Sequence, residues 1–232
     1  MANTEYSGGS MASSLTDLMT SLAVIFILLF VATLNNAQQE SKQTVTSMLV
    51  AFQTLFQNYV VSGVEVTANP TDPLGLLILV PEGLLQFPVN DSAVSENGIE
   101  FLRAFAPRLA GAACSQTFRD EIDSIVVEGH TDSSGTDAVN LPLSQNRSLA
   151  VVREILQVLD QADTTRNDGA GLRGCFVTLL SASGRGSAEP IVDASGIRQQ
   201  ARSRRVVFKI RVRSLEQRQL RDVLTAGVDQ SD

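Results

Sequence analysis

The sequence predicts an α/β sandwich domain preceded by a single transmembrane helix. Two observations indicate this: an uncharged apolar run near the N-terminus, and an alternation of short apolar runs with helix-periodic segments from Leu74 onward. The length of 232 residues and the apolar content of 44% are sufficient for one domain with a real core and an appendage. The order strand, helix, strand, helix, strand and final strand is typical of helices packed over a mixed sheet.

The transmembrane helix is predicted over residues 13–35. No charged side chain occurs from Leu18 to Leu34, and the flanking residues from Ser13 extend this segment to membrane-spanning length. A cleaved signal peptide is the alternative, but no basic region precedes the run and no small-residue cleavage site follows it. We therefore expect a retained helix with residues 1–12 as a short tail.

Asp17 lies at the start of the predicted span, about one turn into the helix. A carboxylate at this depth is costly against lipid, so an intramembrane acid is a functional candidate. The alternative is that Asp17, next to Thr16, favours the helix N-terminus in the headgroup region. A group that changes charge at this depth would change the contacts of the helix with a partner, as an ion-driven motor requires.

A second helical pattern covers residues 45–59, where apolar side chains recur at spacings of three and four. They are Val45, Met48, Leu49, Phe52, Leu55, Phe56 and Tyr59. We expect this stripe to pack on its own domain or on a neighbour; the alternatives are a dimer seam or a plug at the membrane surface. Pro70 and Pro73 then indicate a break. Residues 36–73 are therefore predicted to form an amphipathic helix and linker.

The globular domain is predicted over residues 74–213, followed by a C-terminal tail over 214–232. Continuous or alternating apolar runs predict strands, and apolar residues at helical spacing predict helices. The predicted strands are 74–80, 122–127, 175–180 and 205–212, and the predicted helices are 97–109 and 143–159.

The segment that follows the second predicted strand carries a motif in several pieces. The pieces are Gly-His-Thr-Asp at 129–132, Gly135, Asn140, Leu143, Ser144, Arg147, Ala150 and Val151, then 182–191 and 204–206. Together they resemble the OmpA-like peptidoglycan-binding domain shared by OmpA, Pal and MotB. The resemblance extends over about residues 74–212. Ser203 stands where the family has Asn.

The resemblance implies that Asp132 and Arg147 hold peptidoglycan. A diaminopimelate side chain in a peptide stem ends in an ammonium and a carboxylate, so its recognition needs one fixed anion beside one fixed cation. Arg147 can hold a carboxylate with a forked pair of hydrogen bonds. His130 and Thr131 are further candidates, with a purely structural role in the loop as the alternative for His130. Without the motif, a loop-capping Asp132 and a solvated Arg147 would be the simpler interpretation.

Arg204 and Arg205 are also candidate contacts to glycan or peptide, and a charged start to an edge strand is the alternative. Half of the 18 Lys and Arg residues lie between Arg198 and Arg221, whereas the net charge is −7. This balance argues against nucleic-acid binding but is compatible with a local contact to an anionic wall polymer.

No enzyme activity, cofactor or metal site is expected. His130 is the single histidine, and the serines form no recognisable arrangement of nucleophile, base and acid. Cys114 and Cys175 are too few for a disulfide scaffold, but one bridge between them would contribute about 4 kcal/mol on the chain-entropy model. Two unpaired buried thiols are the alternative.

The N-terminal segment extends the resemblance to MotB-type stator subunits. Residues 14–34 are most similar to the corresponding helix of the ZorB subunits of Zorya anti-phage defence systems, and the tail lacks the basic residues typical of flagellar MotB. The resemblance implies a homodimer inside a ring of MotA- or ZorA-like multi-span subunits, with Asp17 as the carrier of protons or sodium ions. It also implies an inner-membrane protein with a cytoplasmic N-terminus and a periplasmic domain. The alternatives are a passive tether of OmpA or Pal type and a flagellar MotB-type subunit.

Overall fold

The computed structural model describes residues 8–60, 63–88, 91–164 and 171–228. The chain divides into two compact units, Met1–Glu40 and Ser41–Asp232. Helix α1 (Gly8–Val60) begins in the first unit and ends in the second. Its segment from Ser14 to Tyr59 is long and apolar enough to cross a membrane by length and composition, so the predicted N-terminal apolar helix is confirmed.

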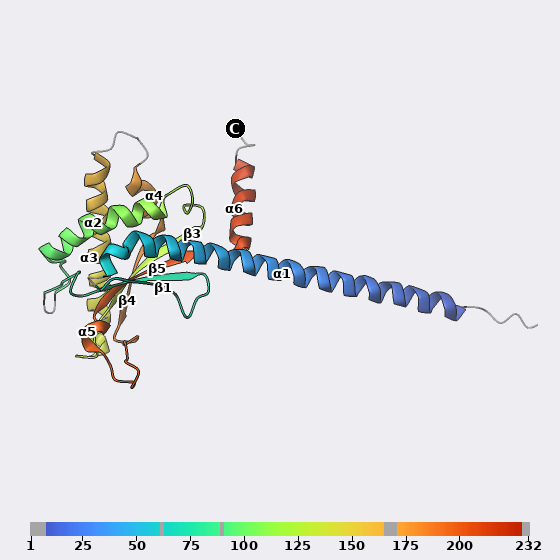
Figure 1. Cartoon of the computed structure of the whole chain (residues 1–232), viewed down its shortest axis with the longest axis horizontal. Coiled ribbons are helices and arrows are strands. Elements are labelled where there is room, and N and C mark those ends of the chain that lie inside the picture. Colours follow the sequence, from blue (N-terminus) through green and yellow to red (C-terminus); the bar gives the residue numbers. More distant parts are fainter. Residues whose placement is uncertain (1–7, 61–62, 89–90, 165–170, 229–232) are drawn as a thin grey trace, which may run out of the picture. The chain divides into compact units, whose positions relative to one another are not determined.

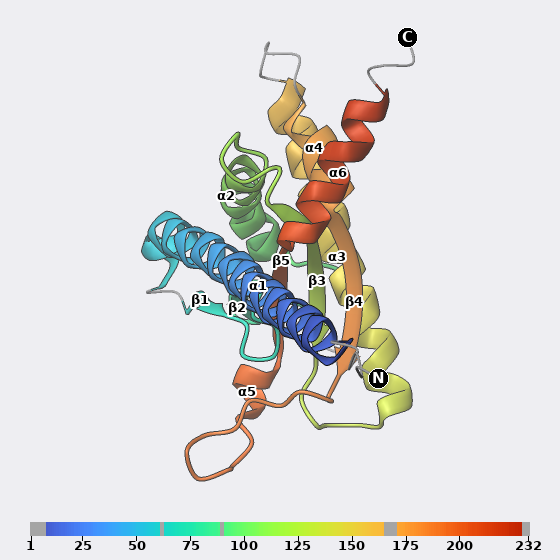
Figure 2. The same cartoon turned by 90° about the vertical axis from the view of Figure 1, so that its right-hand side faces the viewer.

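The second unit contains a five-stranded mixed sheet within the described residues, with the strand order β1-β2-β5-β3-β4 (Figure 2). The strands are β1 (Glu65–Ala68), β2 (Gly75–Pro81), β3 (Ile122–His130), β4 (Leu180–Gly186) and β5 (Arg205–Val212). Strand β5 is central and pairs antiparallel with both β2 and β3, whereas β3 and β4 are parallel. The predicted fold class is therefore confirmed.

The second unit also contains the helices that Figure 1 labels after α1. They are α2 (Glu96–Ala113), α3 (Asp137–Thr164), α4 (Leu172–Leu179), α5 (Gln200–Ser203) and α6 (Leu215–Val228). Helices α2 and α3 lie on one face of the sheet, because Phe105 of α2 contacts Phe208 of β5 (5.2 Å between ring centroids) and α3 lies against Gly129 of β3. The main core lies between this face and the helices.

The apolar stripe at the end of α1 belongs to that core. Met48, Phe52 and Phe56 are each 0% exposed, and the ring of Phe56 stacks on Phe105 with 4.7 Å between centroids. The stripe therefore packs on its own domain. We expected residues 36–73 to form a helix and linker outside the domain. The compact unit begins at Ser41, so the part of this segment that carries the stripe contributes to the domain.

Three details differ from the expectations. Residues 175–179, which were predicted to form most of the third strand, lie in α4, and the strand that follows them is β4. The apolar run also suited a strand, but Phe176 and Leu179 bury one face of a short helix. Strand β5 is central, so a charged start to an edge strand does not explain Arg204 and Arg205. Strand β1 and helix α6 were not predicted from the sequence.

The structure contains the Cys114–Cys175 disulfide, with 6.2 Å between the two Cα atoms. Cys114 is the residue that caps the end of α2, and Cys175 lies in α4, which leads into β4. The bridge therefore ties α2 to the helix that precedes an edge strand of the sheet.

Candidate functional site

The candidate site lies where β2 and β3 end and β5 begins. The register pairs Arg205, the first residue of β5, with Pro81 at the end of β2 and with His130 at the end of β3. Residues just beyond these pairs are therefore brought together, although they are far apart in the sequence. They are Glu82 after β2, Thr131 and Asp132 after β3, and Arg204 before β5.

A pocket of about 350 Å³ is present at this point, and both Asp132 and Arg147 line it. Its lining residues are Glu82, Phe87, Thr131, Asp132, Ser134, Asn140, Leu143, Arg147 and Arg204. Of the peptidoglycan-binding residues expected from the sequence, Asp132, Arg147, Thr131 and Arg204 thus lie around one pocket.

Asp132 is the anion of this pocket. Its Oδ1 accepts a hydrogen bond from the backbone amide of Ser134 (2.9 Å), and its Oδ2 accepts one from Nη1 of Arg204 (2.8 Å). Burial opposes ionisation of Asp132, but the hydrogen bonds from Arg204 and Ser134 outweigh it and lower the pKa of this carboxyl. Asp132 is therefore a fixed negative charge at the edge of the pocket.

Arg147 is a buried cation whose orientation is fixed by backbone and aromatic contacts. Its Nε donates to the carbonyl of Asp91 (3.1 Å), its Nη2 donates to that of Pro88 (3.5 Å), and its guanidinium lies 4.9 Å from the ring centroid of Phe87. Burial lowers the pKa of Arg147 from its usual high value, and the charge of Glu82 opposes this effect. An arginine remains charged in proteins.

Thr131 supplies a polar group without a partner. Its side chain is buried, and its hydroxyl has no hydrogen-bond partner among the described residues. Its backbone amide donates to the carbonyl of Gly186 (2.9 Å), which fixes the residue at the wall of the pocket. Buried polar groups are normally satisfied, so this inaccessible hydroxyl needs an ordered water, or a rotation of the side chain that lets it reach the pocket.

Close packing of α3 on the sheet positions Arg147. A Cβ on Gly129 would lie 2.2 Å from the backbone oxygen of Ser144, so only glycine allows this approach. The hydroxyl of Ser144 donates to the carbonyl of Leu141 (2.8 Å) and accepts from the amide of Gly186 (2.9 Å). These motif residues are structural: they hold the helix against β3 and β4.

The loop between β3 and α3 is held from two sides. The side-chain amide of Asn140 donates to the carbonyl of Ser134 (2.9 Å), and Gly135 in this loop has a φ of 87°, which favours glycine. On the other side, Ser133 and Gln200 exchange two hydrogen bonds, from the Ser133 amide to Oε1 (3.1 Å) and from Nε2 to the Ser133 hydroxyl (2.8 Å). The position of Asp132 is therefore defined by α3 and α5 together.

His130 and Arg205 do not line the 350 Å³ pocket. The side chain of His130 is 1% exposed, and its Nε2 lies 3.6 Å from Glu128, which in turn pairs with Lys209 (2.7 Å). Burial lowers the pKa of His130 despite its interaction with Glu128. Arg205 donates to the carbonyls of Glu189 (3.1 Å) and Ser203 (3.2 Å). Both side chains support the surrounding structure in this conformation.

Glu128, His130 and Glu189 place one potential metal-ligand atom each within 4.8 Å of one another. However, Glu128 is ion-paired with Lys209, and Glu189 is ion-paired with Arg185. A cation would have to displace both basic side chains. The cluster is therefore already balanced by its own charges.

Ser203, at the position where the family has Asn, has a structural role. Its hydroxyl donates to the carbonyl of Gln199 (2.8 Å) and accepts from the amide of Ile191 (3.0 Å), and the side chain is buried. Sequence reasoning did not assign five of the residues that line the pocket: Glu82, Phe87, Ser134, Asn140 and Leu143. Asn140 and Leu143 were recognised only as pieces of the motif. Glu82 and Phe87 belong to no recognisable motif, and only a position after a predicted strand could have suggested Glu82.

Comparison with known proteins identifies the class. The model of the OmpA family matches residues 87–204, and the chain belongs to that family. More particularly, the chain is similar to the Zorya protein ZorB of Escherichia coli, with 24% identity over 214 residues that cover 85% of this chain and 86% of ZorB. The resemblance predicted from the motif pieces is thus confirmed.

At least one solved structure has the same fold. A MotB-like protein from Desulfovibrio vulgaris superposes with a TM-score of 0.54 and 21% identity, covering 76% of this chain and 96% of that protein. The periplasmic domain of Helicobacter pylori MotB matches with a TM-score of 0.47 and 17% identity, covering 71% of this chain and 92% of that domain.

Proposed function

We propose that this protein is the peptidoglycan-anchored subunit of an ion-driven motor in the bacterial inner membrane, and that the motor acts in anti-phage defence. The observation that carries the proposal is a pocket with a fixed anion, a fixed cation and an unpartnered hydroxyl, in a chain that also has a membrane-length helix with an acidic residue near its start. Similarity to ZorB along most of the chain supports the combination.

The pocket has the chemistry to hold the end of a diaminopimelate side chain. Asp132 would accept hydrogen bonds from the ligand's ammonium, and Arg147 would donate to its carboxylate. After rotation of its buried side chain, the unpartnered hydroxyl of Thr131 would add a third polar contact. Because these groups are fixed by neighbouring backbone, little ordering is needed on binding, which favours affinity.

The membrane end supports a motor rather than a passive tether. Asp17 lies in α1, with its side chain exposed on the helix in a region otherwise dominated by apolar residues. In the assembly that we propose, this carboxylate carries protons or sodium ions between a homodimer of this chain and a surrounding ring of MotA- or ZorA-like subunits. The N-terminus would be cytoplasmic, the OmpA-like domain periplasmic, and peptidoglycan the fixed support against which the ring works.

The binding part is tested by co-sedimentation of the full-length protein, in detergent, with purified peptidoglycan sacculi. Asp132→Asn keeps the shape of the side chain but removes its charge, and we expect it to lose most of the bound fraction. Asp123→Asn is the matched control, because Asp123 is ion-paired with Arg213 at the beginning of β3 rather than beyond its end. Undiminished binding by Asp132→Asn would reject the assigned site.

The motor part is tested at Asp17. When the chain is co-produced with its multi-span partner, Asp17→Asn should abolish ion flux and phage protection while assembly and sacculus binding stay normal, and Asp17→Glu should retain part of both. If Asp17→Asn protects as well as the unaltered protein, Asp17 carries no ion and the protein is a passive tether.

A further inference from the structure

The charged side chains that line the pocket form ion pairs with one another. Nη1 of Arg204 lies 2.8 Å from Asp132, Nε of Arg204 is hydrogen-bonded to Glu82, and the other oxygen of Glu82 lies 4.0 Å from Nη1 of Arg147. Four side chains therefore form one row of alternating charge: Asp132, Arg204, Glu82 and Arg147. Asp132 and Arg147 are the groups that would hold the ligand. Arg204 lies where the ligand's ammonium would bind, and Glu82 lies where the ligand's carboxylate would bind.

The position of Glu82 is set by the sheet. Glu82 follows the last residue of β2, and its backbone amide donates to the carbonyl of Arg204 (3.2 Å), which continues the β2–β5 ladder by one step. The amide of Leu84 then turns back to the carbonyl of Pro81 (3.0 Å). Because backbone hydrogen bonds hold Glu82 beside Arg204, its carboxylate lies near both Arg204 and Arg147 before any ligand binds.

We propose that Glu82 is a built-in competitor for the carboxylate of the ligand and thereby sets the affinity of the pocket. This inference rests on the proposed function. A ligand carboxylate that approaches Arg147 meets the charge of Glu82, and a ligand ammonium that approaches Asp132 must replace Arg204, which Glu82 holds. Glu82 lies outside the matched family segment, residues 87–204. It follows the last residue of β2, so the segment that carries the motif does not include it.

The test uses the full-length protein in detergent and a soluble muropeptide whose stem ends in meso-diaminopimelate, with affinity measured by calorimetry. Glu82→Gln keeps the size of the side chain and removes the competing charge. The expected result is a dissociation constant about threefold lower, a modest change because Glu82 is partly exposed and its carboxylate lies 4.0 Å from Arg147, at the limit of an ion pair. Loss of Arg147 in the same background should remove the gain.

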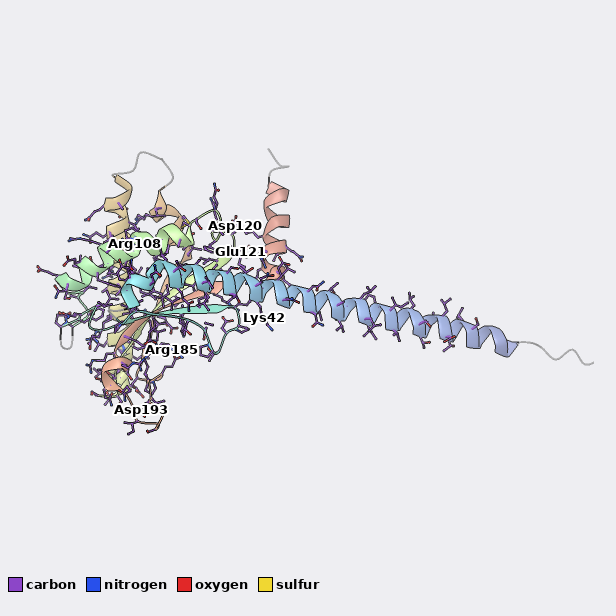
Figure 3. All side chains as sticks on the ribbon, in the orientation of Figure 1. Lys42, Arg108, Asp120, Glu121, Arg185 and Asp193 are labelled. Atoms are coloured by element: carbon purple, nitrogen blue, oxygen red, sulfur yellow. A yellow bond between two sulfur atoms is a disulfide. The ribbon has the colours of Figure 1, made fainter. Side chains whose placement is uncertain are left out.

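Glu121→Gln is the matched control. The side chain of Glu121 is 25% exposed, against 26% for Glu82, and it is ion-paired with Arg218 at 3.0 Å. It immediately precedes β3, whereas the pocket lies beyond the other end of that strand; Figure 3 labels Glu121 there. Both variants remove one negative charge, so a general attraction to an anionic wall polymer would affect them equally.

The outcomes separate this inference from the proposed function. Tighter binding by Glu82→Gln but not by Glu121→Gln supports the competitor. Unchanged or weaker binding by Glu82→Gln, or equal tightening by both variants, overturns it even if the unaltered protein binds. If neither the unaltered protein nor Glu82→Gln binds muropeptide, the proposed function fails and this inference fails with it. Should Glu82→Gln not fold, Glu82→Asp, which withdraws the charge by one methylene, must shift affinity in the same direction.

Discussion

Replacing Arg147 with lysine tests whether the geometry of the guanidinium, beyond its charge, holds the ligand. The Nε and Nη2 donors of Arg147 are directed to the carbonyls of Asp91 and Pro88, so the remaining edge, with Nη1, can face a carboxylate. Lysine keeps the positive charge but cannot make these contacts together. Loss of one charge-assisted hydrogen bond to the ligand, worth about 2 kcal/mol, should weaken binding about 30-fold.

The assay is calorimetry with the diaminopimelate muropeptide, supported by co-sedimentation with sacculi. Arg153→Lys is the control, because Arg153 lies on the same helix, is exposed and does not line the pocket. Arg147→Ala should be more severe than Arg147→Lys, since it also removes the packing against Phe87. If Arg147→Lys binds as tightly as the unaltered protein, the forked contact does not exist and charge alone accounts for binding.

Three further predictions concern the scaffold and use circular dichroism, because the chain has no tryptophan. Replacing Cys114 and Cys175 with alanine opens a link across a sequence separation of 61 and should lower the free energy of unfolding by about 4 kcal/mol; a loss below about 1 kcal/mol would contradict the chain-entropy account. Gly129→Ala should cost at least about 3 kcal/mol because its Cβ would overlap the backbone of α3, whereas Gly111→Ala, with open space around it, should cost little. Burial lowers the pKa of His130, so the unfolded state binds more protons and stability should fall as the pH drops below about 6.5; His130→Gln should flatten this dependence between about pH 7 and 5, and an unchanged slope would exclude His130 as its source.

Periodicity predicted the elements in which one face is clearly buried. Strand β5 has the predicted bounds, because Val206, Phe208, Ile210 and Val212 are buried at every second position, with Lys209 and Arg211 more exposed between the last three of them. The apolar run at 175–180 was assigned wrongly, since a short apolar segment without alternation suits a buried strand and a buried helix equally. The actual strand, β4, is rich in Ser and Gly and carries no apolar signal that could have identified it.

The site was predictable to the extent that one continuous segment contains it. Asp132 and Arg147 lie on a single loop and helix, so their motif could be recognised from the sequence. His130 is the last residue of β3, where the alternation of the strand directs its side chain to the face opposite Gly129, and its contact with peptidoglycan stays a prediction. Glu82 and Arg204 are brought together by the β2–β5 register, which no local pattern specifies.

The packing of the α1 stripe also bears on whether this segment can act as a detachable plug or a dimer seam. Either role would require the apolar face at Met48, Phe52 and Phe56 to leave the core, and each of these side chains is fully buried. Exposing three such side chains would cost about 6 kcal/mol, at roughly 2 kcal/mol each. That is comparable to the entire stability of many domains, about 5 to 15 kcal/mol. Binding to another surface would have to offset this cost while the domain lost the stacking of Phe56 on Phe105. If the proposed motor were regulated by release of this stripe, the domain itself would have to open, whereas a seam formed by the exposed side of the same helix would leave the core intact.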